Sequence, residues 1–192
     1  TAQGAKLRIE NGWYAGDKRL VREVAELAVH PAGKDHRALD LTLTWTPLEQ
    51  PLTLRGAEGK SYGGFNFRFG PRTKTVITVP EGTMLPDGVT AHQGRVSGDL
   101  LMTRLPWVDL VGDFRGPVAM SGAAIFVAPE HRDFPPTWMA RHYGLVSVGW
   151  PGVESQTFPP GQPIACRYRI WIHRGTPPAS EIQQAYAAFG GP

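Results

Sequence analysis

Large apolar side chains recur at every second position in several segments of the chain, most clearly over residues 36–46. The four in this segment are Leu39, Leu41, Leu43 and Trp45. A period of two is typical of an antiparallel strand with one buried face. The same period predicts strands over residues 20–30, 65–69, 73–79 and 164–173. Within residues 65–69, three Phe residues should face the core, which turns Asn66 and Arg68 to the opposite face.

Turn and helix signals mark the two ends of the chain. Asn11-Gly12 separates two short apolar runs, and both residue types tolerate the positive φ of a two-residue turn, so we predict a hairpin over residues 6–14. Residues 180–189 carry apolar side chains at helical spacing, which predicts a closing amphipathic helix. Its apolar stripe consists of Ile182, Ala185, Tyr186 and Phe189.

Residues 133–150 combine prolines, aromatic residues and charged residues within a few positions. Pro135-Pro136 fixes a rigid approach, and Thr137 is suited to cap one short helical turn over residues 138–140. A strand over residues 144–150 follows, and three chemically active residues lie just before its start: Arg141, His142 and Tyr143. Loops on a rigid scaffold tend to carry function, so we predict the site here.

A purely structural interpretation of the same stretch is open as well. Trp138 and Tyr143 would then plug the end of a sandwich, while Arg141 pairs with a carboxylate. The last predicted strand allows two interpretations too, because one of its faces carries Arg167, Arg169, Trp171 and His173. Such a face is either solvated or the lining of a polar cleft, and the usual exposure of charged residues favours the solvated face.

The composition favours an all-β fold. The 192 residues include 23 Gly and 18 Pro, which indicates many turns and few long helices. We therefore predict an antiparallel β-sandwich of roughly ten strands with a short C-terminal helix. No linker or repeat divides the chain, so residues 1–192 are expected to form one domain.

Charge and hydropathy exclude several classes of partner. The net charge of +3 comes from scattered basic and acidic residues without a basic run, which argues against nucleic acid. Cys166 is the single cysteine, so a disulfide within the chain and a cysteine-based metal cluster are excluded. No segment approaches the ~20 apolar residues of a membrane span, and we expect a soluble protein. The cytoplasm is slightly favoured over the periplasm, although the sequence leaves the compartment open.

Five motifs occur in order along the chain: GKSYGGFNFR (59–68), PWVDLVGDF (106–114), SGAAIFV (121–127), PTWMARHYG (136–144) and YRIWIHRG (168–175). With these motifs the chain resembles a bacterial family of unknown function that carries the label "methane oxygenase PmoA". The resemblance runs through most of the chain. A membrane copper monooxygenase needs spanning helices, which this sequence lacks, so the label is a poor guide to activity.

The resemblance implies a β-sandwich of the galactose-mutarotase type, as found in sugar mutarotases and other carbohydrate-active proteins. Family members usually also carry an upstream half with a His-His-Arg-type motif, which is absent here. The chain would then be the C-terminal part of a larger sandwich or a shortened relative. The expected partners are a small sugar, and either a second copy of the chain or a missing N-terminal half.

Sugar chemistry of the mutarotase type needs a general acid and a general base on either side of the ring, among aromatic side chains that stack on the sugar. This chain offers His142 as the acid and Glu23 or Asp109 as the base. The candidates for substrate binding are Lys60, Tyr62, Arg68, Trp107, Trp138, Arg141, Tyr143 and Arg169, with Trp171 as a further platform. These residues are far apart in sequence, so their convergence depends on the fold.

A metal site is a weaker hypothesis. The chain has six His residues, and His30 and His36 flank one turn, but no HxH or HExxH spacing occurs. Ser121-Gly122 lacks the elbow of a serine hydrolase. We therefore predict no metal and no other cofactor.

Two functions without catalysis stay open, a carbohydrate-binding module and a structural half-domain that packs on another chain. The three alternatives differ in what they expect. An enzyme should hold His142 and a carboxylate within hydrogen-bond reach in a closed pocket. A binding module should show coplanar exposed Trp residues along an open groove, and a structural half should expose a large apolar surface.

Overall fold

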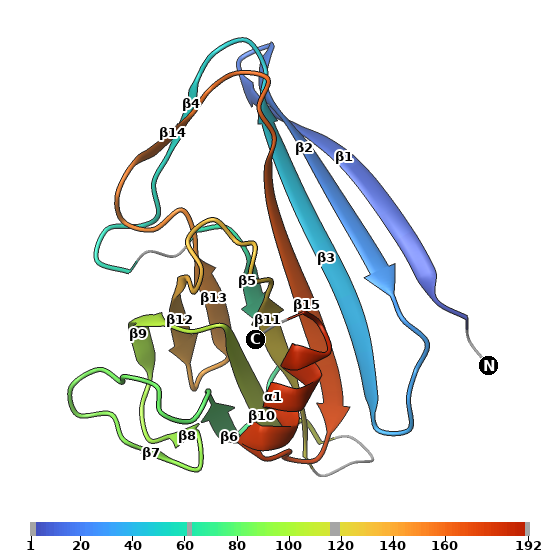
Figure 1. Ribbon diagram of the computed structural model, residues 1–192, viewed down its shortest axis with the longest axis vertical. Coiled ribbons are helices and arrows are strands. Elements are labelled where there is room, and N and C mark those ends of the chain that lie inside the picture. The colour runs from blue at the N-terminus through green and yellow to red at the C-terminus, as the bar shows by residue number, and fades with distance from the viewer. Residues whose placement is uncertain (1–2, 61–62, 116–119, 191–192) are drawn as a thin grey trace.

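Two antiparallel sheets and one short helix form the protein in the computed structural model, which describes residues 3–60, 63–115 and 120–190 (Figure 1). The predicted sandwich with a short C-terminal helix is thereby confirmed. The larger sheet has nine strands. In spatial order they are β1 (Ala5–Ala15), β2 (Lys18–Val29), β3 (His36–Pro47), β15 (Ile164–Arg174), β11 (Ser121–Val127), β10 (Trp107–Asp113), β6 (Thr73–Thr78), β8 (Arg95–Val96) and β7 (Ala91–His92).

The smaller sheet has four strands, in the order β5 (Asn66–Arg68), β13 (Leu145–Gly149), β12 (Thr137–Arg141) and β9 (Leu100–Arg104). A separate two-stranded ribbon joins β4 (Leu52–Leu54) to β14 (Gln156–Phe158). The strands predicted over residues 20–30, 36–46, 73–79 and 164–173 are confirmed as β2, β3, β6 and β15. Short strands such as β7 and β8 raise the total above the roughly ten expected, because two-residue pairings leave no periodic signal.

The core lies between the two sheets. Inward side chains of β12 and β13, including Trp138 and Val146, pack against Ile125 of β11 and Tyr168 of β15. All four side chains are at most 1% exposed. Burying this apolar surface on both sheets stabilises their face-to-face arrangement.

A helix, α1 (Ala179–Ala187), covers the other face of the larger sheet. Ile182 and Tyr186 pack there against Trp107, Phe126 and Trp171. The predicted apolar stripe of this helix is thus confirmed. No helix among the described residues is long and apolar enough to cross a membrane.

The prediction of a solvated face on the last strand is wrong for its second half. Trp171 is 7% exposed because α1 covers it, and His173 is 3% exposed, with its ring 4.9 Å from that of Trp171. Arg167 and Arg169 lie beside the end of the helix, with their guanidinium carbons 4.4 and 4.7 Å from the centre of the Phe189 ring. A covering helix is a non-local feature that the alternation within one strand does not indicate.

The predicted turn at Asn11-Gly12 is also wrong. β1 continues through both residues, and Asn11 lies opposite Glu23 of β2 and donates a hydrogen bond to its carboxylate at 3.0 Å. The chain reverses instead at Gly16, whose φ of +59° is the left-handed conformation that favours glycine. Gly12 leaves room for the side chain of Arg19, whose Nε would lie 2.7 Å from a Cβ at this position.

The predicted helical turn over residues 138–140 is wrong because these residues form the middle of β12. The strand is paired on both sides, with β13 and with β9. Backbone hydrogen bonds to two neighbours outweigh the local capping preference of Thr137.

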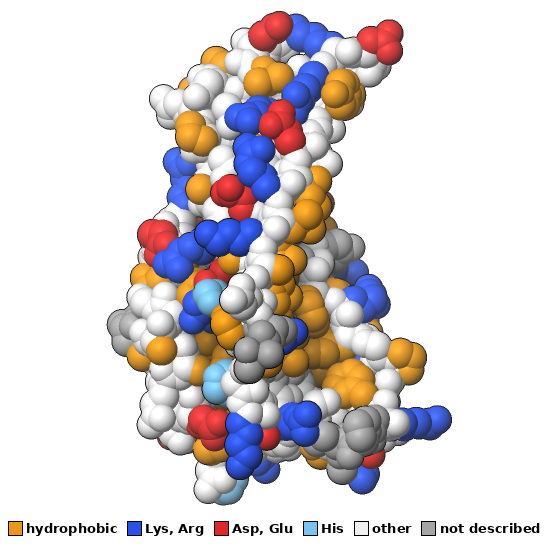
Figure 2. All heavy atoms as spheres, turned by 90° about the vertical axis from the view of Figure 1, so that its right-hand side faces the viewer, with side chains coloured by type: hydrophobic (Ala, Val, Ile, Leu, Met, Phe, Trp, Pro, Cys, Tyr) orange, Lys and Arg blue, Asp and Glu red, His pale blue; other side chains and the backbone are white. Residues whose placement is uncertain are grey.

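Strands β1–β3 extend away from the sandwich body (Figure 1), and Figure 2 views the molecule from their side. One face of this projecting sheet carries ion pairs, such as Arg22 with Glu10 at 2.8 Å. The other face is mostly apolar, apart from Asn11 and Glu23, and its outermost apolar side chains, Leu7 and Ile9, are 54% and 44% exposed. The two faces therefore differ sharply in polarity.

We predict that Ile182→Ala lowers the free energy of unfolding by about 2–5 kcal/mol, because Ile182 is fully buried between α1 and the larger sheet. Chemical denaturation measures the change. Gln184→Ala, on the exposed side of the same helix, is the control and should change stability by no more than about 0.5 kcal/mol. Equal stability of the two variants would contradict this packing of α1.

Candidate functional site

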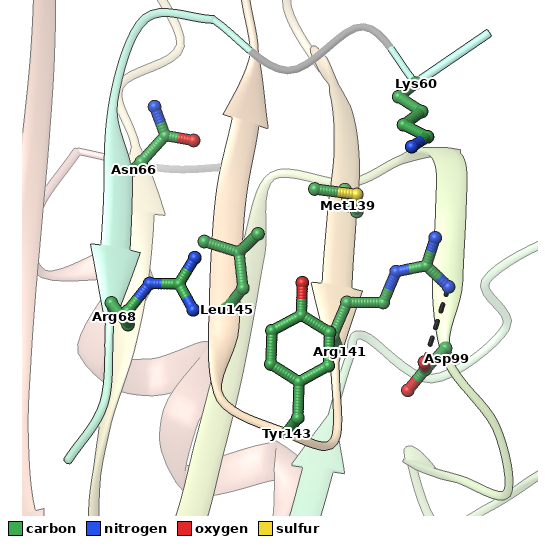
Figure 3. A pocket seen from close by; sticks show the side chains of 8 residues that line it. All are labelled: Lys60, Asn66, Arg68, Asp99, Met139, Arg141, Tyr143 and Leu145. Carbon is green, nitrogen blue, oxygen red and sulfur yellow. Dashed lines mark hydrogen bonds and ion pairs between the residues drawn. The ribbon is translucent and has the colours of Figure 1, made fainter.

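A hollow of about 520 Å³ lies on the outer face of the smaller sheet (Figure 3). We name it the cationic hollow, after three basic side chains in its lining. The residues that line it are Lys60, Asn66, Arg68, Asp99, Met139, Arg141, Tyr143 and Leu145. They come from three strands, two loops and one turn, so the hollow exists only in the folded chain.

Strand alternation places these side chains. Because Trp138 and Ala140 point into the core, Met139 and Arg141 of β12 point outward. Arg141 lies opposite Leu145 on β13, and Leu145 lies opposite Arg68 on β5, so these three form one row across the sheet.

Asp99 organises one side of the hollow. Its Oδ1 accepts the backbone N–H of His142 at 2.8 Å and lies 2.9 Å from Nδ1 of the same residue. Its Oδ2 accepts a hydrogen bond from Arg141 at 3.3 Å. Burial alone would raise the pKa of Asp99, but the hydrogen bonds from His142 and Arg141 outweigh it and hold the pKa below the ordinary value. Asp99 is therefore an ionised acceptor at neutral pH.

Arg68, Lys60 and Tyr143 form the exposed part of the cationic hollow. The guanidinium carbon of Arg68 lies 5.9 Å from the centre of the Tyr143 ring, and Tyr143 is 62% exposed. In the view of Figure 3 the Tyr143 ring stands between Arg68 and the guanidinium of Arg141. Beneath them, Met139 and Leu145 form a buried apolar floor. The hollow thus combines hydrogen-bond donors, one acceptor carboxylate and an apolar surface.

His142 lies at the rim of the cationic hollow and belongs to the turn between β12 and β13. It lines a neighbouring hollow of about 370 Å³ that shares Tyr143. Its backbone carbonyl accepts a hydrogen bond from Arg72 at 2.7 Å. With Nδ1 facing Asp99, Nε2 makes no hydrogen bond to any residue that the structure describes. A histidine held in this way can exchange a proton through Nε2.

Both carboxylates that the sequence suggested as the base lie outside the lining of the cationic hollow. Glu23 of β2 accepts hydrogen bonds from the indoles of Trp13 and Trp45, at 2.9 and 2.8 Å. Asp109 of β10 is fully buried and its Oδ1 lies 2.9 Å from Nε2 of His173. The carboxylate within reach of His142 is Asp99 instead.

Three further predicted binding residues have structural partners elsewhere. Trp138 is fully buried and donates to the carbonyl of Leu105 at 2.6 Å. Trp107 is equally buried and donates to Oε1 of Gln183 at 2.8 Å. Arg169 binds the Asp40 carboxylate through two hydrogen bonds of 2.6 and 2.8 Å. Each of these partners lies outside the lining of the cationic hollow.

Of the binding residues predicted from sequence, four line the cationic hollow together: Lys60, Arg68, Arg141 and Tyr143. Tyr62 lies outside the described residues. Asp99 was not among the residues predicted for the site, because its contacts with Arg141 and His142 join positions 42 and 43 residues apart in sequence. The alternation in residues 65–69 could have indicated Asn66 as a site residue, because it places Asn66 on the same exposed face as Arg68.

Metal binding has no support in the described part of the chain, where no group of three His, Cys, Asp or Glu side chains is arranged to hold an ion. The two histidines that flank one turn point to different partners. His30 lies 2.7 Å from the Asp40 carboxylate, and the ring of His36 lies 5.8 Å from that of Trp171.

We predict that Asp99→Asn lowers the free energy of unfolding at pH 7 by about 1 kcal/mol, since charge-assisted hydrogen bonds at a half-exposed site are lost. The folded-state pKa of Asp99 is lowered, so its stabilisation is complete above the unfolded-state pKa of about 4. It is lost as the pH falls through the lower folded-state pKa. Urea denaturation of both proteins from neutral to acidic pH measures the gap, and a gap that stays constant would contradict the assignment.

Comparison with known proteins identifies the family of the chain but assigns no activity to it. The chain matches a family model over residues 1–187, and that model describes a family of unknown function (DUF6807). Searches of curated proteins and of solved structures each found no match. The family of unknown function is therefore confirmed, whereas the methane-oxygenase label is not supported. Because the match covers nearly the whole chain, the chain belongs to the DUF6807 family.

Proposed function

We propose that the chain recognises a saccharide in the cationic hollow. The observation that carries this proposal is the convergence of Lys60, Arg68, Arg141 and Asp99 around the exposed ring of Tyr143. A pyranose presents hydroxyl groups around its edge and C–H groups on its faces. The hollow offers matching donors, an acceptor carboxylate and apolar surface in a volume of about 520 Å³.

The apolar contribution supports a sugar over a simple inorganic ion. Met139 and Leu145 form the floor, and Tyr143 provides an aromatic face beside them. Asn66 donates its side-chain N–H to the carbonyl of Gly63 at 3.2 Å, which leaves its own oxygen available to accept a hydrogen bond from a hydroxyl. Mixed surfaces of this kind suit a ligand with both polar and apolar parts.

Acid–base chemistry on the bound sugar or keto-sugar is the catalytic form of the proposal. His142 would exchange the proton through Nε2, and Asp99, 2.9 Å from Nδ1, would orient the ring and stabilise its protonated form. Asp99 takes the role that the sequence analysis gave to Glu23 or Asp109. The link to mutarotase-type sandwiches belongs to this proposal as well.

Recognition without catalysis is the main alternative, and the position of His142 favours it. His142 lines the neighbouring hollow and reaches the cationic hollow only at its rim. The expected platform of coplanar exposed Trp residues is replaced by one exposed tyrosine, Tyr143. A structural half-domain has a separate observation in its favour, the apolar face of the projecting sheet with Leu7 and Ile9 exposed.

The acid–base form of the proposal predicts that His142→Ala and His142→Gln both reduce turnover of a sugar substrate about 10²–10⁴-fold, the usual contribution of a positioned acid or base. The dissociation constant of the sugar should change less than about threefold, because His142 lies at the rim. A screen of sugars and keto-sugars for anomerisation and isomerisation, followed by calorimetric titration, measures both quantities.

His92→Gln is the matched control, since His92 is an exposed histidine on β7 outside the lining of both hollows. Turnover and affinity should be unchanged in this variant. If both His142 variants keep full turnover, the acid–base form is wrong, and saccharide recognition alone remains. If no sugar binds the parent protein, the proposed function itself is wrong.

A further inference from the structure

The charges around the cationic hollow do not balance. Three side chains in its lining are basic, Lys60, Arg68 and Arg141, and one is acidic, Asp99. Asp99 is already bound to Arg141 at 3.3 Å and to the backbone N–H of His142 at 2.8 Å. Neither Lys60 nor Arg68 has a carboxylate within 4.0 Å in the part of the chain that the structure describes. Both positive charges are therefore available to a ligand.

We propose that the saccharide bound in the cationic hollow is acidic, with a carboxylate on its ring, as in a uronic acid. This inference rests on the proposed function and specifies its substrate class. The planar guanidinium of Arg68 matches a carboxylate through two parallel hydrogen bonds, and Lys60 adds a compact positive charge. Arg68 is exposed and already faces the Tyr143 ring, so the carboxylate would be bound next to the aromatic surface.

Asp99 is an acceptor for the hydroxyl groups of an acidic sugar, beside the basic side chains of the hollow. Its pKa is held below the ordinary value, because hydrogen bonds from His142 and Arg141 outweigh the effect of burial, so it stays ionised. An ionised carboxylate accepts hydrogen bonds from hydroxyl groups and repels a second anion. A uronic acid brings one negative charge and several hydroxyl groups. A phosphate brings nearly two negative charges, which raises both its repulsion from Asp99 and its attraction to the three basic side chains, so the 6-phosphates are included in the binding experiment.

Several other arginines in the described part of the chain are paired with carboxylates. Arg22 binds Glu10, Arg167 binds Glu130, and both pairs lie on exposed surface. Arg169 binds Asp40 through two hydrogen bonds. In the cationic hollow, Arg68 contacts the ring of Tyr143, and Asp99 is occupied by Arg141 and His142.

Titration of the intact protein with matched sugars tests the inference. The set consists of D-galacturonate and D-glucuronate, the neutral sugars galactose and glucose, and the 6-phosphates of both. At low ionic strength we expect each uronate to bind at least about tenfold more tightly than its neutral parent, since a charge-assisted arginine contact is added. The ratio of uronate affinity to neutral-sugar affinity should be smaller at about 0.15 M salt, where screening is stronger.

Variants locate the charge that recognises the carboxylate. Arg68→Gln and Lys60→Gln should each lower uronate affinity several-fold more than they lower the affinity for the neutral sugar, because only the uronate loses a charge-assisted contact. Arg68→Lys should be intermediate, because it keeps the charge and loses the planar fork. Arg95→Gln, at an exposed arginine of β8 outside the hollow, is the control and should change neither affinity. Thermal midpoints close to the parent value confirm that the variants are folded.

Each outcome bears on one claim. Equal affinity for a uronate and its neutral parent would overturn the acidic class and leave saccharide recognition standing. Tighter binding of the 6-phosphates would overturn the carboxylate. An equal loss of neutral and acidic sugar in Arg68→Gln would overturn the role of Arg68 in charge recognition. Failure of the parent protein to bind any of the six sugars would overturn the proposed function.

Discussion

The burial of Trp138 between the two sheets determines which side chains of β12 reach solvent. Trp138 is fully buried, and its indole donates to the carbonyl of Leu105 at 2.6 Å, so the strand has one register in which this large side chain is satisfied. Side chains of a strand alternate between its two faces, so Arg141, three positions after Trp138, points outward. A slip of one residue would turn Arg141 into the core and Trp138 to solvent. The cationic hollow is therefore a consequence of core packing.

Asp99 connects this packing to the chemistry of the site. It lies 43 residues before His142 in sequence, yet it accepts the backbone N–H of His142 and contacts both its ring and Arg141. These contacts fix the turn after β12 and keep the carboxylate ionised, because together they outweigh its burial. They also occupy the one acid among the described residues that line the hollow, so Arg68 and Lys60 are left to attract a ligand.

Local patterns predicted the parts of the fold and site that depend on a single strand. The alternation in β3 and β15, and the outward positions of Asn66 and Arg68, follow from a period of two. Features that depend on contacts between separate segments of the chain were not predicted. The tryptophans around Glu23, the helix over Trp171 and the Asp99–His142 contact all join residues at least eight positions apart. The turn after β1 lies at Gly16 because the pairing of β1 with β2 continues through Asn11 and Gly12.

Backbone amide shifts from a nitrogen–proton correlation spectrum, recorded as D-galacturonate is added, test directly whether an acidic sugar binds in the cationic hollow. We expect the changes in amide chemical shift to concentrate at Arg68, Asp99, Arg141 and Tyr143, and the amides of β1–β3 to be unaffected. Shifts that cluster on the apolar face around Leu7 and Ile9, or that avoid the outer face of the smaller sheet, would contradict it.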